Sequence, residues 1–132
     1  MKLVSDYWVD VIAKHEEIEN PDWSQVQQAI CRLDADVRTA VTVSLEDGSH
    51  IGVGGGGGRF MVFYGTAFTE DEAYFTLIDP NKSEIEEENL VTGGQPGIFP
   101  ANKIVNLEFA LRAAQTFFET GRRDPELSWV QE

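Results

Sequence analysis

Hydrophobic and polar residues alternate in the middle of the chain, which is the pattern of a half-buried β-strand. Val41, Val43 and Leu45 are separated by polar residues, and the alternation resumes in residues 51–53. Between them lies Asp47-Gly48, a favoured two-residue hairpin turn because both central positions of such a turn need positive φ. We therefore expect two antiparallel strands joined by a tight turn.

Other apolar segments predict further strands. "DYWVDVI" (residues 6–12) fits an opening strand, with a helix as the alternative. "RFMVFYG" (59–65) and "AYFTLID" (73–79) are apolar on both faces, which predicts central positions in the sheet. A polar connection follows, in which "NLV" (89–91) is compatible with one short strand.

Two segments show helical spacing instead. The first is predicted over residues 21–34, with Pro21 at its start and Val26, Ile30 and Leu33 on one face. The second is predicted to be capped by Asn106 and ended by Gly121. Its apolar face comprises Leu107, Leu111, Ala114 and Phe118, widened by Ala110, Ala113 and Phe117.

The order of these elements predicts an α+β fold. We expect an antiparallel β-sheet meander, with a helix in the N-terminal half and a long C-terminal helix packed on one face. Because no repeat and no linker interrupts the pattern, residues 1–132 are expected to form a single domain.

The charge narrows the classes of partner. The net charge is −13 and the pI is near 4.4, which disfavours direct binding to nucleic acid or to an anionic membrane. Such acidity suits solubility, a basic protein partner, or both. Asp6 and Asp10 interrupt the apolar core that a signal peptide needs, and no segment approaches the ~18 apolar residues of a membrane helix. We therefore expect a cytoplasmic protein.

The run "GVGGGGG" raises the question of a phosphate-binding loop. Gly52, Gly54 and Gly57 match the G-x-G-x-x-G pattern, which binds dinucleotides only where the glycines lead into a helix. Here they lead into the strand-like segment 59–65, and no Lys-Ser or Lys-Thr follows as a P-loop requires. The pattern favours a flexible hairpin turn or a site of close backbone approach. A nucleotide- or small-ligand-binding regulator using Gly52–Gly58 remains the alternative function.

Catalytic and metal-binding patterns are lacking in the sequence. His15 and His50, the only histidines, belong to no metal-binding motif, and no G-x-S-x-G is present. Cys31, the only cysteine, is expected to be a small buried residue on a helix. We predict no enzyme, no cofactor and no metal.

Two acidic runs are candidates for partner binding. "SEIEEEN" carries Glu84, Glu86, Glu87 and Glu88, and "TEDEAY" (69–74) includes Glu70 and Asp71. The first run fits a solvated loop, or a short helix that Ser83 starts with Glu86 as its capping partner. The alternative is a patch that faces lysines and arginines of a partner and speeds the encounter.

The segment "VTGGQPGIFP" (91–100) predicts a shaped loop, because three glycines and two prolines fall in ten residues. Ile98 and Phe99 are expected to be exposed there, where an apolar side chain can anchor an interface. The alternative is that Phe99 folds back onto the core.

Four stretches together resemble the immunity protein 1 family of bacterial polymorphic toxin systems. They are "NPDWSQVQQAICRLD", "GGGGGRF", "LVTGGQPG" and "AAQTFFETGRRDPELSW", and they span residues 20–129. The most specific positions are Gly93, Gly94, Gly121, Pro125 and Trp129. The resemblance implies structural roles for these residues, with Trp129 closing over the sheet.

The resemblance also implies a function. It implies an α+β antitoxin that binds a cognate toxin, usually of the deaminase superfamily, and blocks the cleft that takes the target base. Such an inhibitor needs no chemistry of its own, and its acidity suits a basic toxin. The resemblance does not define the contact residues. From charge and exposure we propose Glu70, Asp71, Glu84, Glu86, Glu87, Glu88 and Phe99. A non-toxin adaptor is a further alternative.

Overall fold

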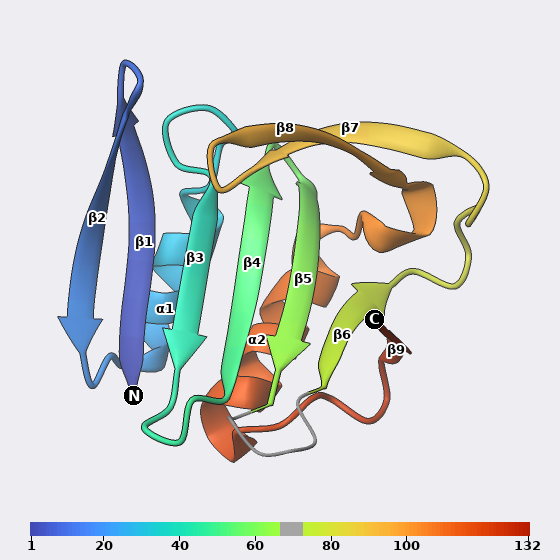
Figure 1. Cartoon of the computed structure of the whole chain (residues 1–132). Helices are drawn as coiled ribbons and strands as arrows, with labels where there is room; N and C mark the ends of the chain where they lie inside the picture. Colours follow the sequence, from blue (N-terminus) through green and yellow to red (C-terminus); the bar gives the residue numbers. More distant parts are fainter. Residues whose placement is uncertain (67–72) are drawn as a thin grey trace.

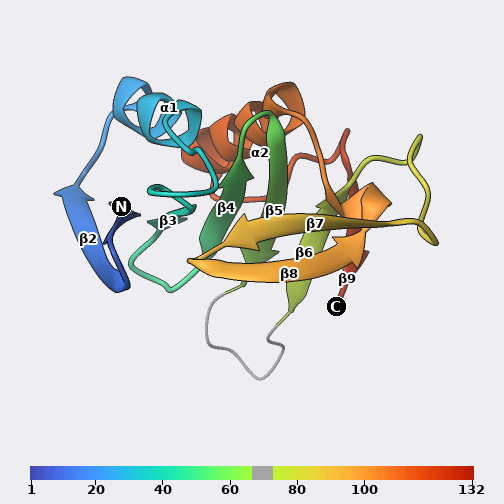
Figure 2. The same cartoon turned by 90° about the horizontal axis from the view of Figure 1, so that it is seen from above.

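The computed structural model describes residues 1–66 and 73–132. In these two ranges, seven strands form an antiparallel sheet in the order β2-β1-β3-β4-β5-β6-β9. Both α-helices cover one face of this sheet, and the hairpin β7–β8 lies on the opposite side, across one end (Figures 1 and 2). The predicted α+β fold, with its largely meandering sheet and helices on one face, is confirmed.

The strands of the sheet are β1 (Lys2–Val9), β2 (Ile12–Glu19), β3 (Ala40–Ser44), β4 (His50–Gly56), β5 (Arg59–Gly65), β6 (Tyr74–Ile78) and β9 (Ser128–Gln131). The hairpin consists of β7 (Glu87–Thr92) and β8 (Gln95–Pro100), and the helices are α1 (Trp23–Cys31), α2 (Leu107–Thr120) and the short 3₁₀ helix η1 (Ala101–Lys103). No helix among these described residues is long and apolar enough to cross a membrane.

The N-terminal hairpin differs from the prediction. The predicted strand 6–12 begins earlier, at Lys2, and ends at Val9, because Asp10 takes a left-handed backbone conformation (φ 54°) and turns the chain. Residues 12–19 then return as β2, a strand that the sequence did not predict. Because β2 is an edge strand with almost every side chain exposed, it lacks the apolar alternation that marks a buried strand.

Helix α1 is shorter than predicted. Asp22 caps it with a capping box: its Oδ1 accepts the N–H of Gln25 at 2.8 Å, and the Gln25 side chain accepts the N–H of Asp22 at 3.0 Å. The helix ends at Cys31 with Arg32 as its C-cap, and Ala35 (φ 60°) takes a left-handed conformation in the connection to β3. The expectation that Cys31 is buried is wrong: Cys31 is exposed, since Val26 and Ile30 take the sheet-facing side.

The β3–β4 hairpin is confirmed, but its predicted two-residue turn is wrong. Ser44 pairs with His50, so the connection spans residues 45–49. Only Gly48 (φ 91°) has the positive φ that the tight turn would require of both residues. The Asp47 carboxylate instead accepts the N–H of Ser49 at 2.8 Å, which stabilises the wider loop.

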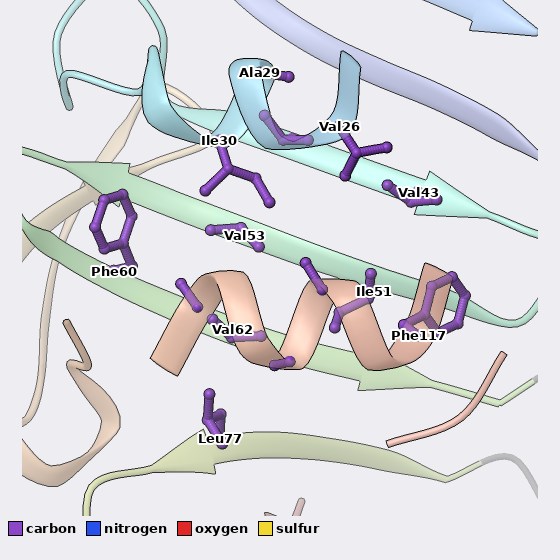
Figure 3. Close-up of a cluster of buried hydrophobic side chains, with 14 of the residues drawn as sticks. Val26, Ala29, Ile30, Val43, Ile51, Val53, Phe60, Val62, Leu77 and Phe117 are labelled. Carbon is purple, nitrogen blue, oxygen red and sulfur yellow. The ribbon is translucent and has the colours of Figure 1, made fainter. Parts of the chain in front are cut away.

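The core lies between the sheet and the two helices (Figure 3). Helix α2 is capped by Asn106, whose side chain accepts the N–H of Phe109 at 2.9 Å, and ends at Gly121 (φ 74°), both as predicted. Each large side chain fully buried here contributes roughly 1.5–3 kcal/mol. Fully or almost fully buried members include Leu3, Val26, Ile30, Val41, Ile51, Val53, Val62, Leu77, Ala110, Ala113 and Phe117.

Candidate functional site

The glycine run forms a hairpin turn and continues into a strand. Gly57 and Gly58 (φ 66° and 82°) make the two-residue turn between the paired residues Gly56 and Arg59. The chain then enters β5, so no helix N-terminus faces the glycines. The prediction of a strand connection is confirmed, and the geometry is unlike that of a dinucleotide-binding loop.

The preceding glycines permit close packing within the chain. A Cβ on Gly54 would lie 2.8 Å from the Thr92 side chain, and one on Gly56 would overlap the backbone at Asp34 and Ala35. A Cβ on Gly55 would lie 2.5 Å from the carbonyl oxygen of Arg59. Side chains at these positions would therefore push the hairpin β7–β8 and the loop before β3 away from β4.

The hairpin β7–β8 contains the predicted strand "NLV". The shaped loop predicted over residues 91–100 is wrong, because residues 95–100 form β8 and pair with β7. Buried Leu90 faces Gly55. At the turn, Gly93 and Gly94 both have positive φ, as a two-residue hairpin turn requires. The N–H of Gly94 donates to the Thr39 hydroxyl at 2.8 Å, and a Cβ on Gly94 would overlap the Trp8 ring.

Asp6 organises this junction, and sequence reasoning missed its role. Its buried carboxylate accepts the N–H groups of Thr39 (2.7 Å) and Ala40 (2.9 Å), the Thr39 hydroxyl, and the Trp8 indole N–H (3.0 Å). Asp6 therefore orients both Thr39 and Trp8, the two residues against which Gly94 packs. A charged residue inside an otherwise alternating strand was the available signal, because burying a carboxylate requires several hydrogen bonds.

The acidic run 84–88 divides into two parts. Glu84, Glu86 and Glu87 are exposed. Ser83 accepts the N–H of Ile85 and of Glu86, both at 3.0 Å. These bonds stabilise a bend at residues 84–86, and the chain enters β7 at Glu87, so the helix alternative is wrong.

Glu88 is half-buried and differs from its neighbours. Its carboxylate lies 2.7 Å from Lys82 Nζ and 2.9 Å from Arg59 Nη2. The hydrogen bond from Lys82, together with the Arg59 guanidinium, lowers the pKa of Glu88 below its usual value. Glu88 thus connects β7 to β5. The other acidic candidates, Glu70 and Asp71, lie outside the described residues.

The structure separates Ile98 from Phe99. Ile98 is 64% exposed. Phe99 is half-buried, and a Cβ on Gly97 would lie 2.6 Å from its ring. Ile98 is therefore the better placed of the two to contact a partner.

The C-terminal motif is built around a second buried carboxylate, Asp124. Asp124 accepts the N–H of Glu126 and the hydroxyl of Thr116, both at 2.8 Å, and Arg112 Nε at 3.1 Å. Burial alone would raise the pKa of Asp124, but these hydrogen bonds lower it below the ordinary 3.8. The Trp129 indole donates to the Asp124 carbonyl oxygen at 3.0 Å.

These contacts connect the tail to both α2 and the sheet. Half-buried Trp129 pairs with Leu77 in the ladder between β9 and β6, and Pro125 is exposed. The sequence pointed to Pro125 and Trp129 in this segment, but it did not identify Asp124. An aspartate that follows two arginines and precedes a proline resembles an ordinary turn residue in the sequence. Its side-chain donors, Arg112 and Thr116, lie on α2 and are distant in the sequence.

Metal ligands do not cluster in ranges 1–66 and 73–132: no group of three His, Cys, Asp or Glu residues could hold an ion there. His15 is exposed on β2. His50 Nδ1 lies 3.0 Å from the Gly48 carbonyl oxygen, and its ring packs against Phe63 with centroids 6.4 Å apart. His15 is thus a surface residue, and the ring of His50 is held by contacts within the fold.

Comparison with protein families agrees with this arrangement. A family model described as immunity protein Imm1 matches residues 14–131, nearly the whole chain. A comparison with curated proteins finds no match. The matched range includes the glycine hairpin, the Gly93-Gly94 turn with its hydrogen bond to Thr39, and the Asp124 network. The chain belongs to the Imm1 family of immunity proteins.

Proposed function

We propose that this immunity protein acts in the cytoplasm as the antitoxin of a polymorphic toxin system. Its cognate toxin is a basic, nucleic-acid-acting enzyme of the deaminase superfamily, and the antitoxin occludes the toxin's active-site cleft. The observation that carries the proposal is the exposed group Glu84, Glu86 and Glu87 beside β7, in a family member with a net charge of −13.

The charge is the reason for choosing this class of toxin. An enzyme that acts on a base must hold the phosphate backbone, so its cleft is lined with lysines and arginines. Carboxylates at 84, 86 and 87 can pair with those groups in place of phosphates. Glu88 is less suited to this task, because Lys82 and Arg59 already neutralise it. Occlusion requires affinity and shape, and it requires no catalytic group.

Charge reversal tests the acidic group. We expect Glu84→Lys combined with Glu86→Lys and Glu87→Lys to weaken toxin binding by roughly tenfold or more at low salt, and to reduce its salt dependence. The matched control reverses three exposed acids elsewhere, Glu46→Lys, Glu108→Lys and Glu119→Lys. Calorimetry over a range of salt concentrations provides the measurement. Equal affinities for the two triple variants would remove these carboxylates from the interface.

A further inference from the structure

Exposed aliphatic side chains gather at one end of the sheet. They come from the β1–β2 hairpin, the loop before β3 and strand β8, which lie at the same end of the molecule (Figure 1). We call this surface the apolar end. Its exposed members are Val9, Val11, Ile12, Val37 and Ile98. The backbone joins two of the segments, because the N–H of Trp8 donates to the Val37 carbonyl oxygen at 2.8 Å.

Two adjoining grooves run through this surface. One, of about 510 Å³, lies between the glycine hairpin and β7–β8 and includes Ile98. The other, of about 350 Å³, extends to Val11. Ala35, Val91 and Pro96 line both grooves, so the two are continuous. Apolar grooves with exposed aliphatic rims are characteristic of protein interaction sites.

Val11 is the least explained residue at this end. It is 89% exposed and stands in the two-residue turn between Val9 and Ile12, after Asp10 at φ 54°. Such turns favour Gly, Asn or Asp, and a β-branched apolar residue gains nothing there from folding. A residue that departs from local preference without a contact inside the fold is a candidate for a contact outside it.

The charges around the grooves indicate the kind of partner. Exposed Asp10 and Asp36 line the groove beside Val11. Arg59, which lines the other groove, is occupied by Glu88 and by the Asn89 carbonyl oxygen at 2.7 Å. Among the residues that the structure describes, the uncompensated charges at the grooves are therefore those of Asp10 and Asp36, and they favour a partner segment that carries positive charge.

We propose that the apolar end holds the cognate toxin through a toxin segment that presents an aliphatic or aromatic side chain flanked by lysine or arginine. This inference rests on the proposed function. The apolar side chain enters the grooves, and the flanking cations face Asp10 and Asp36. A few side chains in well-packed, desolvated pockets carry most of the energy of an interface. On this proposal the toxin side chain that enters the grooves is such an anchor, and Val11 and Ile98 form part of its pocket.

The test is a double variant, Val11→Asn with Ile98→Ser, titrated against the purified product of the gene adjacent to the one that encodes this protein, which we take as the candidate toxin. Asn suits the turn, so the fold is retained, and the unfolding midpoint should not fall. We expect toxin affinity to drop by about tenfold or more. The control variant, Tyr74→Ser with Val130→Ser, removes side chains that are 47% and 36% exposed in β6 and β9, away from the apolar end. The control should bind as the wild type does.

The outcomes separate the two proposals. If the wild type does not bind the toxin, the proposed function fails and this inference fails with it. If the wild type binds and the Val11/Ile98 variant binds equally well, only the inference is overturned. A wild-type dimer that this variant converts to a monomer, with toxin affinity unchanged, would identify a second copy of the chain as the occupant and would also overturn it. If the double variant fails to fold, Val11→Asn alone gives the same comparison.

Discussion

At the scale of single residues, two buried carboxylates hold together parts of the chain that are distant in sequence. Asp6 in β1 accepts hydrogen bonds from Thr39 and Trp8, and through them positions the turn at Gly94. Asp124 connects the C-terminal tail to Arg112 and Thr116 of α2. Each buried carboxylate is stable because donors surround it, and removing those donors would leave an unpaired buried charge.

The glycine pair at the hairpin turn gives a matched comparison. Gly93 and Gly94 both have positive φ, but only Gly94 has a neighbour, the Trp8 ring, in the space of its missing Cβ. We expect Gly93→Ala to lower the free energy of unfolding by about 1–2 kcal/mol through backbone strain alone. Gly94→Ala should cost more, because the ring must also move. Urea unfolding measures both, and equal losses would show that the Trp8 contact contributes nothing.

The hydrogen bonds of Asp124 lead us to expect that the stability of the fold depends on pH. Because its folded-state pKa lies below the ordinary 3.8, its stabilising effect is complete above that value and is lost as the pH falls through the folded-state pKa. We expect Asp124→Asn to lower the free energy of unfolding by about 1–3 kcal/mol near neutral pH. The difference from the wild type should shrink below about pH 4. Urea unfolding of both proteins across this range is the measurement, and a difference independent of pH would contradict the assignment.

At the scale of elements, the glycine run forms a turn and leaves room for neighbouring segments to pack closely against β4. It turns the chain tightly at Gly57-Gly58, and Gly54–Gly56 let β7–β8 and residues 34–35 approach β4. The elements that make the grooves can adjoin only because these three residues lack side chains.

This interpretation predicts the result of a ligand screen. Adenine and guanine nucleotides at millimolar concentration should leave the unfolding midpoint unchanged in a thermal-shift assay. A ligand that binds only the folded state must raise stability, so a saturable rise would favour the nucleotide-binding regulator. Gly57→Ala serves as the control, since a true phosphate site would lose its response in that variant.

The elements also show what the sequence could predict. The continuous apolar segment 59–65 and the helically spaced apolar residues of α2 were located correctly, because burial in the fold leaves these patterns in the sequence. Strand β2 was missed because almost all of its side chains are exposed, so its sequence lacks the apolar alternation of a half-buried strand. Strand β8 was missed because Pro96 and Pro100 disfavour a strand in the sequence but are tolerated in a two-stranded hairpin.

The candidate site was predicted only in part, for a related reason. Composition identifies an acidic run, but it does not show that Glu88 pairs with Arg59, which lies far away in the sequence. The apolar end is assembled from three separate segments, each with only a few exposed apolar residues. Val11 and Ile98 become parts of one surface only when the hairpins are placed side by side.

At the scale of the whole molecule, fold and charge are consistent with a protein that acts by binding. The core and the two buried carboxylates hold the sheet and helices together, and the hairpins β1–β2 and β7–β8 lie at one end of the molecule (Figure 1). Residues of both hairpins line the groove beside Val11. Membership of the Imm1 family implies a cognate toxin as the partner. The net charge of −13 would speed the encounter with the basic toxin that we propose.

The most direct measurement of the central claim is the growth of cells that express the product of the adjacent gene, the candidate toxin, with and without this protein. We predict that cells survive only when both proteins are made, and that the two proteins then purify as one complex. A catalytically inactive toxin should bind equally well, because occlusion depends on shape and charge. Cell death that is unaffected by this protein, with no complex recovered, would contradict the account.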